Sequence, residues 1–437
     1  MKKYPEYKGL NLPNVAAEVL AEWESAQIFE KSITTREGNK PYVFFEGPPS
    51  ANGMPGIHHV MARTIKDIFC RYQTLKGFQV KRKAGWDTHG LPVELGVEKE
   101  LGISKEDIGT KISVDDYNKA CRETVMRYTD VWNKLTEQMG YWVDMDNPYV
   151  TYESKYMESV WYLLAELYKK DLIYKGYTIQ PYSPAAGTGL SSHELNQPGC
   201  YRDVKDTSVT ALFKARKKTL TSEVLKAVDG DVHFIAWTTT PWTLPSNTAL
   251  CVGPKIDYVL VKTFNQYSGK PMNIVLAKAL VAKQLSGKYV EAENEDEFKA
   301  YEFGAKKIPY TIIDEVKGTD MVGTRYEQLL PYAQPYQDAD QAFQVISGDF
   351  VTTEDGTGIV HCAPTFGADD ALVAKNFGVP GMLVLDENGN PRPLVDLQGR
   401  FVPEMVEFAG MYVKNEYYAE GKAPEKSVDV EIAIKLK

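Results

Sequence analysis

The chain lacks the features of a membrane or secreted protein. It has 437 residues and no apolar run of about 18 residues, so no transmembrane helix is predicted. Its first residues include two lysines but no apolar segment of the kind a signal peptide requires. Cysteine is scarce: five residues occur without Cys-x-x-Cys spacing, which argues against a disulfide framework or a Cys-based zinc site. Together these absences favour a reducing cytoplasm.

An excess of positive charge is also missing. Fifty Lys and Arg residues stand against 59 Asp and Glu, a net charge of -9, which argues against broad nonspecific binding of nucleic acid. A local basic patch stays open, with the Lys-Arg-Lys triplet at 81–83 as candidate and a solvated strand end as the alternative. The chain is too long to fold around a single hydrophobic core, so two or three domains are predicted.

The first part of the chain alternates helix and strand patterns. A short buried-strand pattern, a Gly/Pro-rich loop, a helical pattern ended by Gly77 and a second strand form the beginning of a parallel βαβ unit. The predicted helices cover residues 13–33, 58–75, 114–139 and 153–170, and the predicted strands cover 41–47 and 80–87.

Beyond residue 174 short β-rich runs alternate with Gly, Pro and Asp turns. The region 195–405 therefore predicts a separate β-rich domain. The last segment, 427–437, alternates polar and apolar residues like a strand and then stops, so a truncated sheet is expected.

Two runs in this region carry most of the chemistry. The first, WTTTPWTLPSN at 237–247, places hydroxyls between aromatic and proline walls. The second, GTGIVHCAPTFGADD at 356–370, ends a Gly-rich bend with a histidine and two carboxylates. Together they predict a hydrolytic pocket for a small amino acid held by its ammonium group, without an obvious nucleophile or metal. Taken singly, the threonines are typical of a strand, His361 of a structural histidine, and Asp369 and Asp370 of a helix N-cap.

A third run follows the first predicted strand. EGPPSANGMPGIHH at 46–59 lies where a parallel sheet offers helix N-terminal amides to phosphate. His58 and His59 are possible phosphate donors there, although a tight turn is the alternative. Asp87, after the second strand, supplies a carboxylate able to pair with an ammonium group.

The segments FFEGPPSANGMPGIHHVMARTIKDIFCRY and GWDTHGLPVELGVEKELG resemble the class I aminoacyl-tRNA synthetases, specifically the isoleucyl family. The runs at 237–247 and 356–370 are similar to that family's inserted editing domain. The resemblance implies an α/β fold, a partial Rossmann-type nucleotide-binding domain with an inserted β-rich editing domain. The implied limits are a helical extension at 1–40, the first part of the catalytic domain at 41–194, the editing domain at 195–405, and a return segment at 406–437.

The resemblance also implies roles in amino-acid activation. Asp87 would bind the ammonium group of isoleucine, and the loop before the first long helix would bind ATP. Where the family has His-x-Gly-His, this chain has Gly56, Ile57, His58 and His59, so His59 keeps its family position and His58 could act in place of the histidine that Gly56 replaces. The implied isoleucine-binding residues are Gly47, Pro48 and Asp87; the implied ATP-binding residues are Pro49, Asn52, Gly56, His58 and His59.

An editing site is expected because an isoleucine pocket always admits valine. One missing methylene changes binding by only about 1–3 kcal/mol, and this family is itself the standard example of that limit. Asp370 is the expected ammonium anchor, with Asp369 as helix cap. Thr238, Thr239, Thr240 and Thr243 would orient water or the terminal ribose, His361 and Trp237 would limit size, and Asn247 would bind the substrate.

By this resemblance the chain comes from an isoleucine–tRNA ligase that also hydrolyses misacylated Val-tRNA(Ile). It lacks a Lys-Met-Ser-Lys-Ser-like loop, so editing is expected to be retained and full aminoacylation is not. The expected partners are tRNA(Ile), isoleucine, valine and ATP with Mg²⁺, without a membrane, in a cytoplasmic monomer. No structural zinc is expected, because His193 and Cys200 are only two ligands. The alternatives are a free-standing misacylated-tRNA hydrolase and a non-enzymatic tRNA- or nucleotide-binding module.

Overall fold

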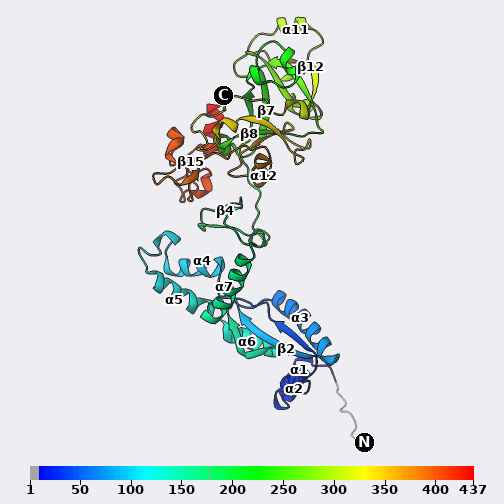
Figure 1. Cartoon of the computed structure of the whole chain (residues 1–437), viewed down its shortest axis with the longest axis vertical. Coiled ribbons are helices and arrows are strands. Elements are labelled where there is room, and N and C mark those ends of the chain that lie inside the picture. The colour runs from blue at the N-terminus through cyan, green and yellow to red at the C-terminus, as the bar shows by residue number, and fades with distance from the viewer. Residues whose placement is uncertain (1–8, 177) are drawn as a thin grey trace. The chain divides into compact units, whose positions relative to one another are not determined.

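The computed structural model describes residues 9–176 and 178–437 (Figure 1). Contacts divide the chain after Gly176 into two compact units, which are described separately. The division precedes the predicted limit at 194/195, because residues 178–194 belong to the second unit. None of the helices in the described ranges is long and apolar enough to cross a membrane.

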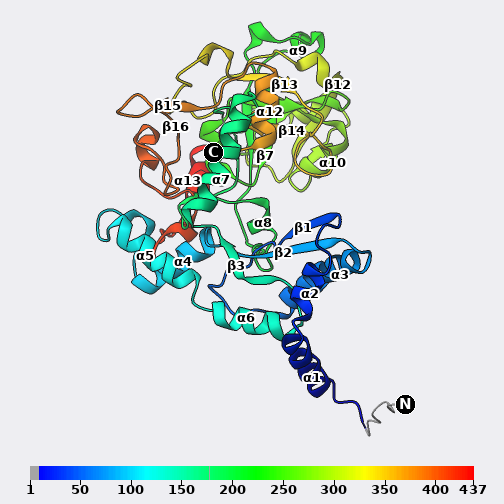
Figure 2. The ribbon, with the colours of Figure 1, turned by 60° about the horizontal axis from the view of Figure 1, so that its bottom comes forward.

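The first unit contains the predicted parallel βαβ arrangement. Strand β1 pairs in parallel with β2, and β2 pairs in parallel with β3, giving the order β1-β2-β3. Helix α3 connects β1 to β2, and both α2 and α3 pack against β2 (Figure 2). The strands are β1 (Pro41–Phe45), β2 (Gln79–Trp86) and β3 (Asp144–Val150).

The four predicted helical regions of this unit are helical, two of them interrupted, and α4 is an additional helix that was not predicted. The pattern at 13–33 forms two helices because Gln27 between them adopts a left-handed backbone with φ of 51°. The pattern at 114–139 likewise divides at residues 126–128. Arg82 of the predicted basic triplet is buried and bonded to Asp67, so the triplet is not a continuous basic surface. The helices are α1 (Leu12–Ser25), α2 (Ile28–Thr34), α3 (Ile57–Leu75), α4 (Leu91–Leu101), α5 (Val114–Val125), α6 (Thr129–Gln138) and α7 (Ser154–Lys169).

The second unit is β-rich. A six-stranded sheet has the order β11-β12-β9-β10-β7-β6, and a three-stranded sheet has the order β13-β8-β14. Two small hairpins, β4-β5 and β15-β16, complete the strands of the described ranges. Their bounds are β4 (Tyr182–Ser183), β5 (Thr188–Gly189), β6 (Val209–Lys214), β7 (Val232–Thr238), β8 (Ala249–Val252), β9 (Asp257–Phe264), β10 (Pro271–Ala277), β11 (Tyr289–Glu291), β12 (Ile308–Lys317), β13 (Gln344–Ser347), β14 (Ile359–Cys362), β15 (Leu383–Leu385) and β16 (Pro391–Pro393).

Short helices cover these sheets. Helix α12 contacts β13, and its Val373 and Ala374 are buried in one hydrophobic cluster with Cys251 of β8 and Ile346 of β13. The helix is labelled in Figure 1. The six-residue 3₁₀ helix η3 (Pro241–Ser246) follows β7 directly. The α-helices are α8 (Ser192–Leu195), α9 (Glu223–Ala227), α10 (Val281–Gln284), α11 (Glu295–Lys299), α12 (Ala368–Asn376) and α13 (Val428–Lys435).

The prediction of a strand at 427–437 is wrong, because Val428–Lys435 forms helix α13. The Ser427 hydroxyl accepts a hydrogen bond from the Val430 N–H at the start of the helix. Val428 and Ile432, one helical turn apart, are buried in the main core of the second unit. The segment 406–437, expected to return to the catalytic domain, therefore packs with the β-rich unit in the described structure.

One glycine places the start of β14. Gly358 has φ of +73°, and a Cβ there would lie 2.4 Å from the Cβ of Ala277. The Tyr258 hydroxyl donates to the Gly358 carbonyl at 2.6 Å. Because a side chain would clash, glycine lets β14 begin close to β10, and His361 follows on that strand.

Candidate functional site

The threonine run is a strand end followed by a tight helical turn. Thr238 is the last residue of β7, and Thr240 precedes the first residue of η3. The Thr240 backbone N–H donates to the Thr238 hydroxyl at 3.1 Å, and the two hydroxyls are 3.2 Å apart. The Thr243 hydroxyl donates to the Thr240 carbonyl at 2.9 Å. The run is therefore not a continuous strand, and three of its hydroxyls gather at one turn.

His361 joins this turn to the second run. Its Nε2 lies 2.8 Å from the Thr243 hydroxyl, and its Nδ1 lies 3.0 Å from the side-chain nitrogen of Asn247. The imidazole is buried, and burial lowers its pKa from 6.5 to about 4. The structure thus brings together three of the predicted residues, Thr243, Asn247 and His361, from runs more than a hundred positions apart.

The hydrogen bonds define where the imidazole carries its proton. The Asn247 amide nitrogen also donates to the Ala249 carbonyl at 2.8 Å, while the Tyr326 hydroxyl donates to Asn247 Oδ1 at 2.6 Å. An amide nitrogen can only donate, so Nδ1 of His361 accepts and its proton lies on Nε2, which donates to Thr243. Both ring nitrogens of His361 are therefore engaged within the protein.

Asp370 lies on the first turn of α12, beside the end of β14. Its Oδ2 accepts a hydrogen bond from the Ala363 backbone N–H at 2.9 Å. Burial raises the pKa of this carboxyl, and the hydrogen bond from Ala363 acts in the opposite direction. Asp370 is half-buried whereas Asp369 is exposed. In the described ranges no hydrogen bond or ion pair joins Asp370 to the threonines.

Successive residues of β7 point to opposite faces of the sheet, which places the remaining residues of the first run in different surroundings. Thr238 is buried, whereas Trp237, on the other face, is 37% exposed. Trp237 packs beside the backbone of Gly356, where a Cβ would approach its ring to 3.3 Å. Thr239 is exposed and Thr240 is half-buried. Of the four threonines, Thr240 is the half-buried residue whose hydroxyl contacts those of Thr238 and Thr243.

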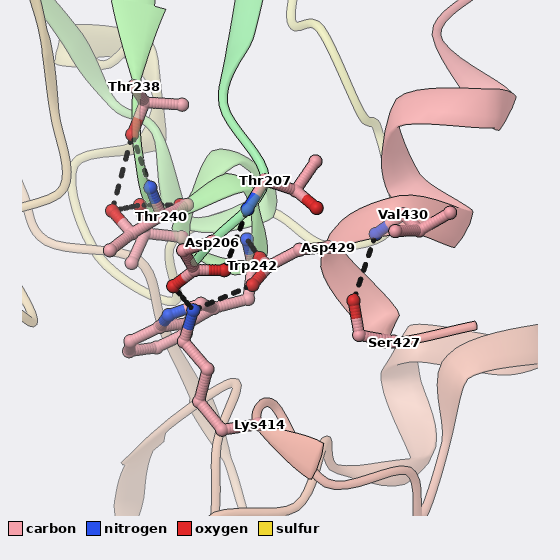
Figure 3. Close-up of polar contacts among 10 residues, drawn as sticks. Asp206, Thr207, Thr238, Thr240, Trp242, Lys414, Ser427, Asp429 and Val430 are labelled. Carbon is pink, nitrogen blue, oxygen red and sulfur yellow. Dashed lines mark hydrogen bonds and ion pairs between the residues drawn. The ribbon is translucent and has the colours of Figure 1, made fainter. Parts of the chain in front are cut away.

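Two residues that sequence reasoning missed support this site. Tyr326 is fully buried and bonds to Asn247, but no motif in the sequence marks it. Asp429 of α13 accepts the backbone N–H of Trp242 at 2.8 Å and pairs with Lys414 (Figure 3). The sequence analysis missed Asp429 because it predicted a strand at 427–437, and the side chain of Asp429 reaches Trp242 from a helix.

The first unit has its own polar framework at the end of β1. The Glu46 side chain is 1% exposed and its Oε1 lies 2.5 Å from Lys66 Nζ. The Tyr141 hydroxyl donates to the Glu46 carboxylate, and the Tyr149 hydroxyl donates to the Glu46 carbonyl. Burial, followed by the bond to Glu46, raises the pKa of Tyr141. These contacts hold the loop that follows β1.

The loops after β1 and β2 meet at the carboxyl end of the sheet. The Asp87 backbone N–H donates to the Pro49 carbonyl at 3.0 Å, which brings the two predicted binding segments together. The Thr88 and Thr151 hydroxyls are 2.8 Å apart, and His89 Nδ1 lies 3.1 Å from the Thr151 hydroxyl. Asp87, Pro48, Pro49 and Asn52 are all half-buried, and Gly47 is exposed.

The two adjacent histidines at the start of α3 differ in environment. His59 Nδ1 accepts the Gly56 backbone N–H at 2.9 Å, and its ring packs edge-on against Trp132. Burial, followed by electrostatic interaction with His58 and Arg63, lowers the pKa of His59. His58 is exposed, so it is the histidine open to a ligand, while His59 caps the helix from within.

A metal site is not evident in the described ranges, where no cluster of three or more His, Cys, Asp or Glu side chains is arranged to hold an ion. Cys200 is exposed and donates to the Glu194 carbonyl, and His193 bonds to Gln197.

Comparison with known proteins identifies the family of the chain. A family model described as tRNA synthetases class I (I, L, M and V) matches residues 18–243, just over half of the 437 residues. The chain therefore belongs to the class I tRNA synthetases. Within that family it is 58% identical over 452 aligned positions to an isoleucine–tRNA ligase of Bacteroides fragilis, and 59% identical over 445 positions to that of Cytophaga hutchinsonii.

Both alignments cover all of this chain but 39% of each relative, so the chain spans about two fifths of their length. A crystal structure of the P. falciparum cytosolic leucyl-tRNA synthetase editing domain is similar over 39% of this chain and 66% of that chain, at 15% identity and a TM-score of 0.25.

Proposed function

We propose that the second unit hydrolyses valine wrongly attached to tRNA(Ile), as part of an isoleucine–tRNA ligase. The observation that carries the proposal is the network joining Thr243, His361 and Asn247, which links the two runs predicted to form one pocket. The homology to isoleucine–tRNA ligases supplies the substrate class. A free-standing hydrolase is disfavoured because the first unit carries the complete strand–loop–helix arrangement of the family.

The network supports hydrolysis by positioning rather than by a protein nucleophile. His361 uses both nitrogens for hydrogen bonds within the protein, so it fixes Thr243 and does not act as general base. Thr240 is half-buried and its hydroxyl contacts the other hydroxyls of the turn, so it would orient the attacking water. An aminoacyl ester is already activated, so correct placement of water and a hydroxyl from the ribose can suffice.

Asp370 is proposed to bind the ammonium group of the amino acid. Its half-buried carboxylate retains one oxygen, Oδ1, outside the bond to Ala363. Uncharged analogues could not make a charge-assisted interaction of this kind. The exposed Asp369 is better suited to the solvent side of α12. His361 would limit the size of the side chain, and Thr238 and Asn247 would border the pocket. Trp237 and Thr239 were also predicted to act in this pocket, but Trp237 lies on the face of β7 opposite Thr238 and Thr239 is exposed, so they would lie at its rim.

The first unit is proposed to contribute part of the activation site. The loop after β1 and the start of α3 lie at the carboxyl end of parallel strands, where helix amides favour phosphate. His58 and the first amides of α3 would bind an ATP phosphate, with Mg²⁺ accompanying the nucleotide, while Gly56 would border the site with its N–H held by His59. Asp87 would bind the isoleucine ammonium. Pro49 and Asn52 would border ATP, and Gly47 and Pro48 isoleucine. The sequence has no Lys-Met-Ser-Lys-Ser-like loop, so we expect this chain not to complete aminoacylation.

Deacylation of purified Val-tRNA(Ile) and Ile-tRNA(Ile) by the chain tests the proposal. We expect the valyl ester to be hydrolysed preferentially, and Asp370→Ala to lower kcat/KM at least about tenfold, the value of one charged interaction. Thr243→Val should lower kcat by roughly 10- to 100-fold because the turn is no longer fixed, while Thr243→Ser retains the hydroxyl as control. Equal rates on both esters, or no decrease in Asp370→Ala, would contradict the proposal.

A further inference from the structure

Helix α13 contacts the threonine turn through one buried carboxylate. Asp429 Oδ1 accepts the backbone N–H of Trp242 at 2.8 Å, although the two residues are 187 positions apart. The Asp429 side chain is 1% exposed. Figure 3 shows this carboxylate pointing from the helix toward Trp242, with Thr240 nearby. A buried charge at this place requires partners, and the site supplies them.

The Trp242 amide is the one that η3 cannot satisfy by itself. The first N–H groups of a helical turn lack partners within it. Pro241 has no N–H, and the Thr243 N–H bonds to the Thr240 carbonyl at 3.0 Å. Asp429 therefore caps η3 from a distant segment, and a carboxylate is the favoured partner at a helix start. Trp242 stands between Thr240 and Thr243, so its backbone position sets theirs.

Lys414 orients the capping carboxylate. Its Nζ lies 2.8 Å from Asp429 Oδ2, leaving Oδ1 for Trp242, and 2.5 Å from Asp206 Oδ2. Burial acts to lower the pKa of Lys414, but its hydrogen bonds to the two carboxylates raise the pKa overall, so the ammonium stays charged. Each oxygen of Asp429 thus has one defined partner.

The indole of Trp242 extends the connection to the second run. Its ring packs edge-on against Phe366, with centroids 4.9 Å apart. Phe366 lies between β14, which carries His361, and α12, which carries Asp370. A shift at Trp242 would therefore disturb both runs together.

We infer that Asp429 is a positioning residue for the hydrolysis proposed above: it fixes the backbone at Trp242 and thereby the hydroxyls of Thr240 and Thr243, with Lys414 orienting its carboxylate. This inference rests on the proposed function for its catalytic readout, while its structural readout is independent of it. Asp429 itself does not touch the substrate.

The test compares Asp429→Ala, Asp429→Asn and the matched control Glu431→Gln in the full 437-residue chain. Glu431 is an acidic residue on the same first turn of α13. The measurements are kcat and KM for Val-tRNA(Ile) deacylation, and amide hydrogen exchange of residues 240–247. We expect Asp429→Ala to lower kcat roughly 10- to 100-fold with KM within about twofold, the pattern of misplaced groups, and to speed exchange of the Trp242 amide.

Asp429→Asn keeps an oxygen that can accept the Trp242 N–H, but its amide nitrogen would face the Lys414 ammonium, so kcat and protection of the Trp242 amide should lie between those of Asp429→Ala and the wild type. Glu431→Gln should match the wild type. Lys414→Met keeps the bond from the Trp242 N–H to Asp429 but removes the partner of Asp429 Oδ2, so we expect kcat to fall less than in Asp429→Ala. This variant provides the test if Asp429→Ala does not fold. Wild-type kcat and exchange in Asp429→Ala would overturn the inference, as would a lower kcat with unchanged Trp242 exchange. A wild-type chain without deacylase activity would refute the proposed function, and the exchange data would still decide the role of Asp429.

Discussion

Lowering the pH should destabilise the second unit through His361. The imidazole is held neutral, with Nδ1 accepting from Asn247 and Nε2 donating to Thr243, and burial lowers its pKa from 6.5 to about 4. An added proton on Nδ1 would face the Asn247 amide hydrogens. Between about pH 6.5 and pH 4 the unfolded chain therefore binds a proton that the folded chain does not, so stability falls as the pH falls through this window.

The size of the effect follows from the change in pKa. Each tenfold change in proton affinity is worth about 1.4 kcal/mol, so the full contribution is about 3 kcal/mol below pH 4. At pH 5 the folded imidazole is still mostly neutral and the unfolded one is mostly charged, which corresponds to a decrease in stability of about 2 kcal/mol relative to pH 7.5.

Urea unfolding of the wild type and His361→Gln at pH 7.5 and pH 5 measures this contribution, because titration of the other groups is common to both proteins. The free energy of unfolding of the wild type should fall by about 2 kcal/mol more than that of the variant between the two pH values. With six histidines in the chain, imidazole NMR with the variant as assignment control can also follow His361 directly. Equal pH dependence in both proteins, or a neutral ring protonated at Nδ1, would refute the reasoning.

Two further predictions concern buried hydroxyls. Tyr326→Phe removes the donor to Asn247 Oδ1 without changing the shape of the ring, and should lower the free energy of unfolding by about 1–2 kcal/mol; an unchanged urea midpoint would contradict it. In the first unit, Glu46→Ala leaves the buried Tyr141 hydroxyl without its acceptor and Lys66 without its partner, and should lower stability by about 2 kcal/mol. Thermal unfolding followed by tryptophan fluorescence checks this, with Glu46→Gln, which keeps an acceptor, as the milder control.

Local pattern predicted the βαβ start of the first unit but not all of its elements. The run at 41–47, the helical periodicity to Leu75 and the strand at 80–87 correspond to β1, α3 and β2, because each is decided by neighbouring residues. The prediction that the first of these strands is buried is wrong, because β1 alternates exposed and half-buried residues, and α4 and β3 were not predicted. The β-rich texture of the second unit was likewise predicted from local pattern. The two runs at 237–247 and 356–370 were also recognisable, since their residue types are unusual in combination. The structure brings the two runs into contact through Thr243 and His361, and the pocket between them stays a prediction.

Other features depended on contacts that no local pattern records. Val428 and Ile432 read as alternating strand residues, yet burying both on one face against a core built from earlier segments favours a helix. The tautomer of His361 is decided by Asn247 and Ala249, and the orientation of Asn247 by Tyr326, which stands 79 residues away. Hydrogen bonds between distant segments have no periodicity in sequence. The residue types of the site were therefore recognisable in the chain, whereas their protonation, their supports and the role of α13 were decided by tertiary packing.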